Sequence, residues 1–393
     1  MSSPAPSPEY LDRIAKEKAH FSNCTNLHEL PQIFHYWSNK FILPKLQAVG
    51  WESVPHMFEK SMIQRCAAAS SGLRQFVSIG SGKGEMEIQL AKALRAKGHA
   101  NFRLACVELN SGLIAEGRAN AKTVGVSDNI QFVEADFNEW RAAEQYDVVM
   151  ASHSLHHVMN LEGLFDEIKR SLAPHGQFVT ADMIGRNGHM RWPEALDIVQ
   201  EFWRELPPGH RYNQLLRRHE ETYENWDCSM EGFEGIRAQD ILPLLVERFH
   251  FEKFVAFSNV TGPFVDRAFG HNFDPESEWD RDFIDRVHLR DEQEMLAGRL
   301  KPTIMIAAMS NQPMILSQHL GPFSPEFSIR WPNGRQVVHE AETANNDRRL
   351  RALENDLAQT QKAMENARWQ IEQAANSKWV RLGRSLGLGP KLR

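Results

Sequence analysis

The chain has 393 residues, of which 42% are hydrophobic and 24% are charged, and its formal net charge at pH 7 is −6. This length and composition predict one large folded domain or two of ordinary size, and they exclude a chain that is disordered throughout. The mildly acidic balance does not favour a general nucleic-acid-binding protein, because such proteins usually display a basic surface.

The N-terminal sequence MSSPAPSPEYLDRIAKEK has no apolar core of the kind that a signal peptide needs. No stretch reaches the ~18 consecutive apolar residues that span a bilayer. The four cysteines form no C-x-x-C pair, which predicts neither a zinc motif nor a disulfide framework and suits a reducing compartment. We therefore expect a soluble cytoplasmic protein.

Residues 1–70 are predicted to form an N-terminal helical segment. From 71 to 310, apolar strands alternate with helices, which predicts an α/β domain with a mostly parallel sheet covered on both faces. The seven expected strands are 75–79, 102–109, 130–135, 146–152, 176–184, 251–260 and 303–310. The expected helices among them are 85–97, 111–123, 161–172 and 236–249. Polar stretches at 185–240 and 264–301 interrupt the alternation, and we expect insertions there that act as lids over one end of the sheet.

Residues 311–345 read as a linker rich in Pro, Ser and Asn. The segment 346–393 begins with heptads, whose two seam positions hold Leu350, Leu357, Met364 and Ile371, and Leu353, Thr360, Ala367 and Ala374. This pattern predicts a coiled-coil helix that joins chains into a homo-oligomer through residues 350–374. The alternative is one amphipathic helix packed on the domain. The basic, amphipathic tail SKWVRLGRSLGLGPKLR predicts a weak contact with the inner membrane surface.

Three glycines at alternate positions, Gly80, Gly82 and Gly84, follow the first expected strand. A dinucleotide fingerprint would need its third glycine at position 85, which is Glu85. A phosphate-binding G-x-x-x-x-G-K-[ST] loop is absent from the sequence. The G-x-G-x-G spacing fits the first loop of S-adenosylmethionine (SAM) binding folds better than either, although a tight strand-to-helix turn would look the same.

Carboxylates follow the next two expected strands. Glu108 ends the second strand, where a carboxylate is suited to bind both hydroxyls of a ribose. Asp136 and Phe137 follow the third strand, and a carboxylate beside an aromatic ring suits an adenine base. Ligands of open α/β sheets bind at the carboxyl ends of the strands, so these residues and the glycine loop predict one site.

The segments VSIGSGKGEMEIQLA, CVELN, VEADF, DVVMASHSLHHV and LFDEIKRSLAPHGQFVTADMIG resemble the ordered motifs of class I SAM-dependent methyltransferases. The resemblance covers about 75–183 and the closing strands to 310. It implies a Rossmann-like seven-stranded sheet with a reversed last strand. It also implies that Gly80, Gly82 and Gly84 line the methionine part of SAM, that Glu108 binds the ribose, and that Asp136 and Phe137 bind the adenine. His153 would lie near the sulfonium.

One position departs from the motif. Many members carry an acidic residue two positions before the first glycine, and this chain has Ser78 there. Glu87 is the expected substitute for the contact to the SAM amino group, with Glu85 as second choice. Either residue is also explained as an ordinary acidic residue in the first turn of a helix.

Histidine titrates in the range that a general base for a hydroxyl needs. The candidates are His153, His157 and His189, with His156 as a further possibility, and each is also explained as a hydrogen-bonded structural histidine. His153 and His157 have helical i,i+4 spacing, but no carboxylate accompanies them as in H-E-x-x-H, so no metal site is expected.

The insertion past the fifth expected strand supplies polar groups for an acceptor with hydroxyls or negative charge. The candidate substrate-binding residues are Asp182, Arg186, Asn187, Arg191 and Arg237. A lid held together by its own salt bridges is the structural alternative.

The sequence therefore predicts a methyltransferase that uses SAM on a small-molecule or glycan hydroxyl. The whole chain also resembles methyltransferases found with bacterial surface-polysaccharide genes, which would make the acceptor a sugar. Two alternatives remain open. One is a catalytically inactive SAM-fold scaffold acting through the coiled coil. The other is an RNA methyltransferase, which the acidic pI and the lack of an Asn/Asp-Pro-Pro-Tyr motif disfavour.

Overall fold

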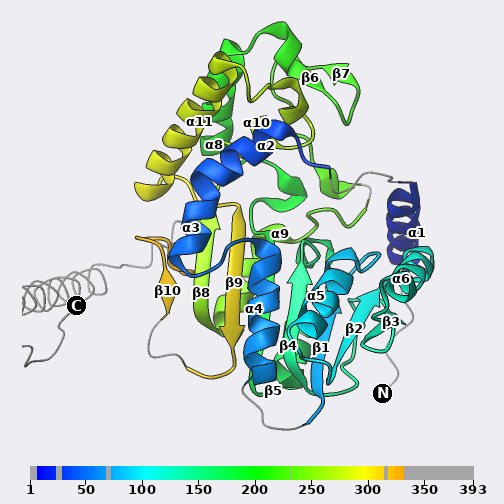
Figure 1. Cartoon of the computed structure of the whole chain (residues 1–393). Helices are drawn as coiled ribbons and strands as arrows, with labels where there is room; N and C mark the ends of the chain where they lie inside the picture. The colour runs from blue at the N-terminus through cyan, green and yellow to red at the C-terminus, as the bar shows by residue number, and fades with distance from the viewer. Residues whose placement is uncertain (1–6, 24–28, 68–71, 231, 314–316, 332–393) are drawn as a thin grey trace, which may run out of the picture. The chain divides into compact units, whose positions relative to one another are not determined.

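The computed structural model describes residues 7–23, 29–67, 72–230, 232–313 and 317–331. One mixed, mostly parallel sheet of eight strands organises them, with the order β10-β8-β9-β5-β4-β1-β2-β3 (Figure 1). Strands β1 to β5 run parallel, β9 is antiparallel to both β5 and β8, and β10 is parallel to β8. The strands are β1 (Arg74–Ile79), β2 (Phe102–Glu108), β3 (Ile130–Glu134), β4 (Tyr146–Ser152), β5 (Leu172–Met183), β8 (His250–Phe257), β9 (Ile304–Ser310) and β10 (Gln318–His319).

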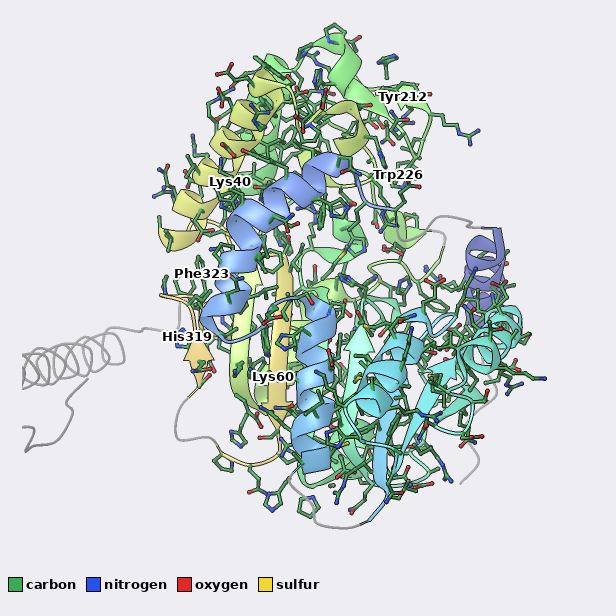
Figure 2. The ribbon with its side chains drawn as sticks, in the orientation of Figure 1. Lys40, Lys60, Tyr212, Trp226, His319 and Phe323 are labelled. Carbon is green, nitrogen blue, oxygen red and sulfur yellow. The ribbon has the colours of Figure 1, made fainter. Side chains whose placement is uncertain are left out.

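The α/β class and the reversed strand agree with the expectation, but the sheet has eight strands where seven were expected. The additional strand, β10, has two residues and lies in the stretch that reads as a linker. Residues 317–330 pack on the domain, and Phe323 among them is buried (Figure 2). The Lys45 ammonium lies 5.7 Å from the centre of the Phe323 ring. A two-residue edge strand leaves no hydrophobic alternation in the sequence, so its pattern could not be recognised.

Helices α5 (Glu85–Ala96), α6 (Ser111–Val124), α7 (Leu161–Ser171) and α9 (Ala238–Arg248) connect the strands. Each presents apolar residues at helical spacing, as in Ile88, Ala91 and Leu94 of α5, and these residues are buried. The N-terminal helices are α1 (Pro8–Asn23), α2 (Gln32–Trp37), a π-helical turn η1 (Ser38–Ile42), α3 (Leu43–Ala48) and α4 (Val54–Ala67).

The two insertions contain helices, although the sequence predicts only polar stretches there. They are α8 (Pro193–Glu205), α10 (Gly262–Val265) and α11 (Glu278–Leu296), and they gather with α2 beyond one end of the sheet (Figure 1). Aromatic side chains pack between them. The ring centres of Trp203 and Phe269 are 4.8 Å apart, and those of Phe264 and Phe283 are 5.4 Å apart. The insertions thus form a folded cap, whose buried residues belong to the same hydrophobic core as those of the sheet.

Short elements complete the described chain. They are the 3-10 turns η2 (Leu155–His157), η3 (Asn187–His189), η4 (Pro208–Arg211), η5 (Cys228–Met230) and η6 (Gly270–Asn272), and the hairpin strands β6 (Tyr212–Asn213) and β7 (Arg218–His219). Among the described helices, none has the length and apolar content to cross a bilayer. The predicted coiled coil at 350–374 and the basic tail lie outside the described residues.

Candidate active site

The loop between β1 and α5 places its three glycines in the left-handed region, with φ of 71° at Gly80, 56° at Gly82 and 68° at Gly84. A Cβ at Gly80 would stand 2.5 Å from the Cβ of Ser154, and one at Gly84 would stand 2.8 Å from the Phe132 ring. At Gly82, no described atom would lie within 4 Å. The outer two glycines therefore allow close packing, whereas the middle one faces open space that a ligand can occupy.

Glu108 ends β2 beside that open position. Its carboxylate accepts hydrogen bonds from the backbone N–H of Gly82 at 3.0 Å and of Asn110 at 2.8 Å. Burial raises the pKa of Glu108, and the hydrogen bonds from Asn110 and Gly82 oppose the rise. The carboxylate thus stands fixed at the carboxyl end of β2, next to the face of the loop that is open.

Glu87 points inward from the first turn of α5. It is 2% exposed, and its carboxylate accepts a 2.6 Å hydrogen bond from the Ser78 hydroxyl. The Glu87 carboxylate therefore lies beside the side chain of residue 78, the position at which many class members carry an acidic residue. The side chain of Glu85 is instead exposed. Burial raises the pKa of Glu87 to about 6. A nearby ammonium group would favour its ionised form.

Asp136 and Phe137 follow β3. The Phe137 ring lies close to Gly80, because a Cβ added to Gly80 would stand 3.7 Å from it. One Asp136 oxygen accepts from the Asn138 backbone N–H at 2.9 Å, and the other accepts from the Tyr10 hydroxyl at 2.6 Å. Burial and Asp136 together raise the pKa of Tyr10. A carboxylate has about four lone-pair directions, so Asp136 retains capacity for an adenine amino group.

Helix α1 extends over these strand ends. The Arg13 guanidinium donates to the Ser229 carbonyl at 3.0 Å, and the Asn110 amide donates to the Lys18 carbonyl at 3.3 Å. Glu17 accepts from the Phe233 backbone N–H at 3.2 Å. The helix therefore connects the end of β2 with the loop before α9.

A cavity of about 320 Å³ lies on the sheet face beside Asp136. Val107, Val133, Trp140 and Tyr146 contribute to its lining, and the glycine loop and the histidines do not. It adjoins the expected adenine position but does not contain the rest of the site.

These residues fit SAM. The backbone is open at Gly82, and Glu108 ends β2 at the position expected to bind the ribose. Glu87 is a buried carboxylate suited to an ammonium, and Asp136 and Phe137 form a carboxylate–aromatic pair. All lie at the carboxyl ends of β1, β2 and β3 or in the turn that follows, the edge at which open α/β sheets bind ligands.

His153 follows β4 at the same edge. Its φ is 51°, which is unusual for a residue other than glycine, and its backbone N–H donates to the Ala181 carbonyl at 2.8 Å. The ring is accessible to solvent, and no hydrogen bond to it is found among the described residues. Surrounding protein nevertheless desolvates it and lowers its pKa. His153 is therefore a neutral imidazole at pH 7, held in a strained backbone conformation.

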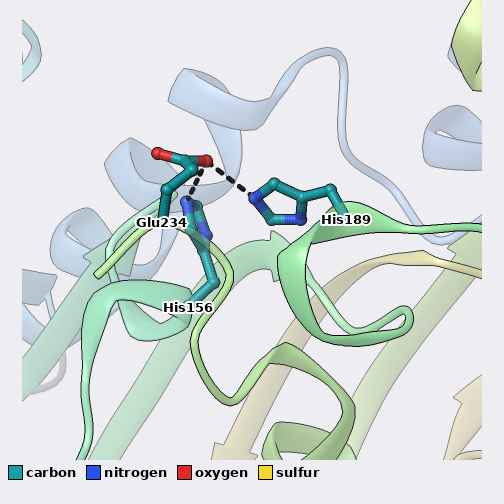
Figure 3. A group of neighbouring side chains, drawn as sticks. All are labelled: His156, His189 and Glu234. Carbon is teal, nitrogen blue, oxygen red and sulfur yellow. Dashed lines mark hydrogen bonds and ion pairs between the residues drawn. The ribbon is translucent and has the colours of Figure 1, made fainter. Parts of the chain in front are cut away.

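The other histidines gather around Glu234, which the sequence reading did not single out. His189 Nε2 lies 2.7 Å from Glu234 Oε1, and His156 Nε2 lies 3.5 Å from the same oxygen (Figure 3). His157 Nε2 lies 3.5 Å from Glu234 Oε2, and its Nδ1 lies 2.7 Å from Glu17 Oε1. Burial lowers the pKa of His189. His153 and His157 do not form a helical i,i+4 pair, because His153 precedes the short turn η2.

Asp182 is not a substrate-binding residue, because its carboxylate is 0% exposed and fully used. It accepts from the backbone N–H of Ser154 at 3.0 Å and of Leu155 at 2.8 Å, and it lies 2.6 Å from His156 Nδ1. Burial lowers the pKa of His156, but the charges and hydrogen bonds of Asp182 and Glu234 outweigh it and raise the value to about 10. In this state His156 is protonated at neutral pH and does not act as a base.

Arg237 is also explained by structure. It donates to both carboxylate oxygens of Glu162, at 2.6 and 2.8 Å, and to Asp240 at 2.8 Å, and so joins α7 to α9. Arg186 donates to the Arg191 carbonyl at 3.1 Å. The salt bridges of Arg237 agree with the structural alternative to substrate binding, whereas Arg186 contacts a backbone carbonyl.

Asn187 accepts a hydrogen bond from the Gln239 backbone N–H at 3.2 Å, at the start of α9. Arg191 differs from the other expected substrate-binding residues in having a buried side-chain nitrogen, Nε, without a partner among the described residues. Its donors reach the Asn259 carbonyl at 2.6 Å and the His189 carbonyl at 2.9 Å. Of the expected substrate residues, Arg191 keeps the best placement.

The sequence held a signal for His156 with Asp182, because His156 follows β4 and Asp182 lies near the carboxyl end of the neighbouring β5, where Ser152 pairs with Ala181. It had none for Glu234, Glu17 or Tyr10. These residues lie in irregular or N-terminal segments, and only long-range folding brings them to the strand ends.

Residues 77–180 match the family model described as "Methyltransferase domain". The ubiquinone/menaquinone biosynthesis C-methyltransferase UbiE of Brucella anthropi is 22% identical over 232 residues, which cover 58% of this chain and 82% of the relative. The UbiE of Vibrio cholerae is 24% identical over 158 residues, covering 40% of this chain and 57% of the relative.

Among solved structures, the chain resembles the O-methyltransferase of a trans-AT PKS multienzyme of Brevibacillus brevis, determined with S-adenosyl-L-homocysteine. The identity is 15%, the TM-score is 0.36, and the match covers 66% of this chain and 73% of that one. The matched domain spans the glycine loop, Glu108, Asp136 and His153, and the protein is a SAM-dependent methyltransferase.

Proposed function

We propose that the protein methylates a hydroxyl oxygen of a sugar, a glycan or another small molecule, with His153 as general base. The carrying observation is the His153 ring, which is accessible, neutral and without a hydrogen-bond partner among the described residues, at the carboxyl end of β4. A hydroxyl is a weak nucleophile at pH 7, so removing its proton as it attacks accelerates the reaction.

SAM, when bound, supplies a methyl group on a positively charged sulfur that an in-line nucleophile can displace. The chain's own task is to hold the acceptor oxygen in line and to accept its proton. His153 takes that proton on a ring nitrogen and, because the ring is accessible, can pass it to solvent. Burial lowers the pKa of His153, and the charge of Asp182 only partly opposes that decrease.

The cap lines the acceptor side with polar groups. Asp266 and Arg267, at the end of α10, lie close enough to His153 for their charges to act on its pKa in opposite directions. Arg191 and Asp266 likewise act on the pKa of Tyr223, which burial raises. Hydroxyl-rich or anionic acceptors match such a lining better than purely apolar ones. A glycan acceptor, as in bacterial surface-polysaccharide biosynthesis, is the first class to test.

A second candidate is methylation at carbon, which the UbiE relatives favour because they are named as C-methyltransferases. An activated ring carbon also loses a proton, so His153 would serve that reaction too. The two reactions differ in the bond formed, and the product therefore decides between them.

The test is a screen with SAM carrying a ¹³C-labelled methyl group. The purified chain is incubated with panels of nucleotide sugars, lipid-linked glycans and phenolic compounds, and products are detected by mass spectrometry and carbon NMR. A methyl ether on a sugar supports the proposal. Transfer to carbon only, or to phenols only, contradicts the sugar reading. Calorimetric binding of SAM in the same sample shows that the cofactor site is intact.

A further inference from the structure

His156, His189 and Glu234 meet although they come from three separate segments. His156 belongs to η2 after β4, His189 to η3 after β5, and Glu234 to the loop before α9. One ligand atom of each lies within 4.8 Å of the other two, and Figure 3 shows all three side chains converging on one point. Two imidazoles and a carboxylate are the donor set of many catalytic sites for first-row divalent cations.

The Asp182 carboxylate orients the first of these ligands. Because it lies 2.6 Å from His156 Nδ1 and is completely buried, it holds a proton on Nδ1 and leaves Nε2 to face Glu234. A carboxylate behind a histidine is the usual outer partner of a metal-bound imidazole. His157 repeats the arrangement at the edge of the cluster, with Glu17 at Nδ1 and Glu234 at Nε2.

The backbone is strained where the ligands are brought together. Gly188 and His189 have φ of 65° and 55°, and the Gly188 N–H donates to the Gly235 carbonyl at 2.9 Å. A Cβ at Gly235 would stand 3.0 Å from the Gly188 nitrogen and 3.1 Å from His189. Strain of this kind, at a non-glycine residue, persists where the surroundings enforce it and is concentrated at functional sites.

The spacing of the donor atoms suits a shared ion. Ligands at about 2.1 Å from a tetrahedral zinc ion stand about 3.4 Å apart. His156 Nε2 and Glu234 Oε1 are 3.5 Å apart, and His189 Nε2, at 2.7 Å from the same oxygen, needs only a small outward movement. Protons on the two imidazoles could also bridge them to the Glu234 carboxylate. The alternative to a metal site is therefore a hydrogen-bonded cluster without a metal ion.

We propose that His156, His189 and Glu234 form a binding site for a first-row divalent cation, with zinc as the representative ion. Three protein ligands leave a position open, as in catalytic zinc sites. An acceptor hydroxyl in that position would become more acidic, and its proton would pass to His153. This role in the reaction rests on the proposed function, whereas the cation site itself does not.

The first experiment measures metal content and affinity. The untagged chain is treated with a chelator, and zinc binding is followed by calorimetry and by elemental analysis after dialysis. We expect one ion per chain, and binding weakened at least about 100-fold in Glu234→Gln and in His189→Ala. Asp182→Asn is expected to weaken it by about 10- to 100-fold, as for other outer-sphere partners. No stoichiometric binding of zinc, cobalt, manganese or iron would overturn the proposal.

A matched control separates the site from general histidine binding. His210 lies 2.8 Å from Asp280 in the cap, so it too is a histidine paired with a carboxylate, and His210→Ala should leave zinc affinity unchanged. Visible absorption of the cobalt(II)-loaded chain is a second measurement, because it depends on the ligand geometry. The absorption band should be lost in Glu234→Gln. Equal zinc affinity in all variants would contradict the site.

Measurements of SAM affinity distinguish the cation-site proposal from the proposed methyltransferase function. If Glu234→Gln loses zinc and keeps SAM binding, the cation site is separate from the cofactor site, as expected. If the wild-type chain binds SAM and methylates a hydroxyl at full rate after chelation, the catalytic role of the cation fails while the methyltransferase proposal stands. If the chelated chain then takes up no added zinc, the cation site itself is overturned.

Discussion

The Tyr10 hydroxyl donates a 2.6 Å hydrogen bond to Asp136 Oδ2, which ties helix α1 to the loop after β3. The two residues are 126 positions apart in the chain. Asp136 is the expected adenine partner, so this bond involves a residue of the expected cofactor site. We therefore predict that α1 influences exchange of the cofactor.

Tyr10→Phe should speed SAM dissociation by about tenfold, because a hydrogen bond to a charged group contributes about 1.5 kcal/mol or more. Stopped-flow displacement with the demethylated cofactor measures the rate. Lys16→Ala is the control, since Lys16 lies on the same helix and pairs only with the exposed Asp12, at 3.0 Å. An unchanged rate in Tyr10→Phe would show that α1 does not control exchange.

Gly82→Ala should abolish most SAM binding at a small cost in stability. A Cβ there meets no described atom within 4 Å, so the change enters the ligand's space rather than the core. Gly98→Ala is the matched control, because Gly98 also has a positive φ, of 85°, and equally free surroundings, but lies at the far end of α5. Both should cost about 1–2 kcal/mol of unfolding free energy from backbone strain. Similar SAM affinities in the two variants would contradict this assignment of the loop.

SAM affinity should fall as the pH drops below about 6 and should be nearly flat above pH 7. Burial raises the pKa of Glu87 to about 6, so below that pH the carboxyl is neutral and loses its attraction for the SAM ammonium. Calorimetry at pH 5.5, 6.5 and 7.5 measures the dependence. Glu87→Gln should bind weakly at every pH, while Glu85→Gln should keep the wild-type profile. The opposite result would make Glu85 the partner of the ammonium.

His153→Asn should lower kcat by about 100-fold or more, the usual contribution of a general base. SAM affinity should change less than twofold, since the side chain touches the acceptor side. Desolvation lowers the pKa of His153 below 6.5, so wild-type activity should decline only at pH values below that, where the ring becomes protonated. The acid limb of the pH–rate profile should disappear in His153→Asn. A normal kcat in this variant would move the base to another residue.

Removal of residues 345–393 should convert an oligomer into a monomer, because the heptad seam of Leu350, Leu357, Met364 and Ile371 is in that segment. Light scattering gives the mass per particle of both chains. SAM affinity, which depends on the sheet, should not change. An unchanged particle mass would show that the helix does not join chains.

Local features made much of the fold predictable. Each of the first five strands is a short apolar run bounded by glycines or polar residues, and the helices after β1, β2 and β4 bury apolar residues at helical spacing. The glycine loop, Glu108 and Asp136 were predictable for a related reason. They follow strands directly, and parallel strands bring such positions to one edge of a sheet.

The cap was harder, because α8 and α11 mix Trp, Arg and His with their apolar residues. In α8 the buried residues Ala195, Ile198, Val199 and Phe202 do recur at helical spacing, and Phe202 packs on Phe283 of the second insertion. In α11 the buried face includes Asp280, Asp291 and Glu294 beside its apolar residues, so its apolar periodicity is weak.

By itself, the sequence determined the α/β alternation and indicated the residues expected to face SAM, because strand periodicity and loop chemistry are local properties. Only the tertiary structure decided that Tyr10 reaches Asp136, that Asp182 supports His156 rather than substrate, and that Glu234 joins two histidines. These contacts join segments separated by up to 126 residues, and their formation depends on chain packing, which no short stretch of sequence encodes.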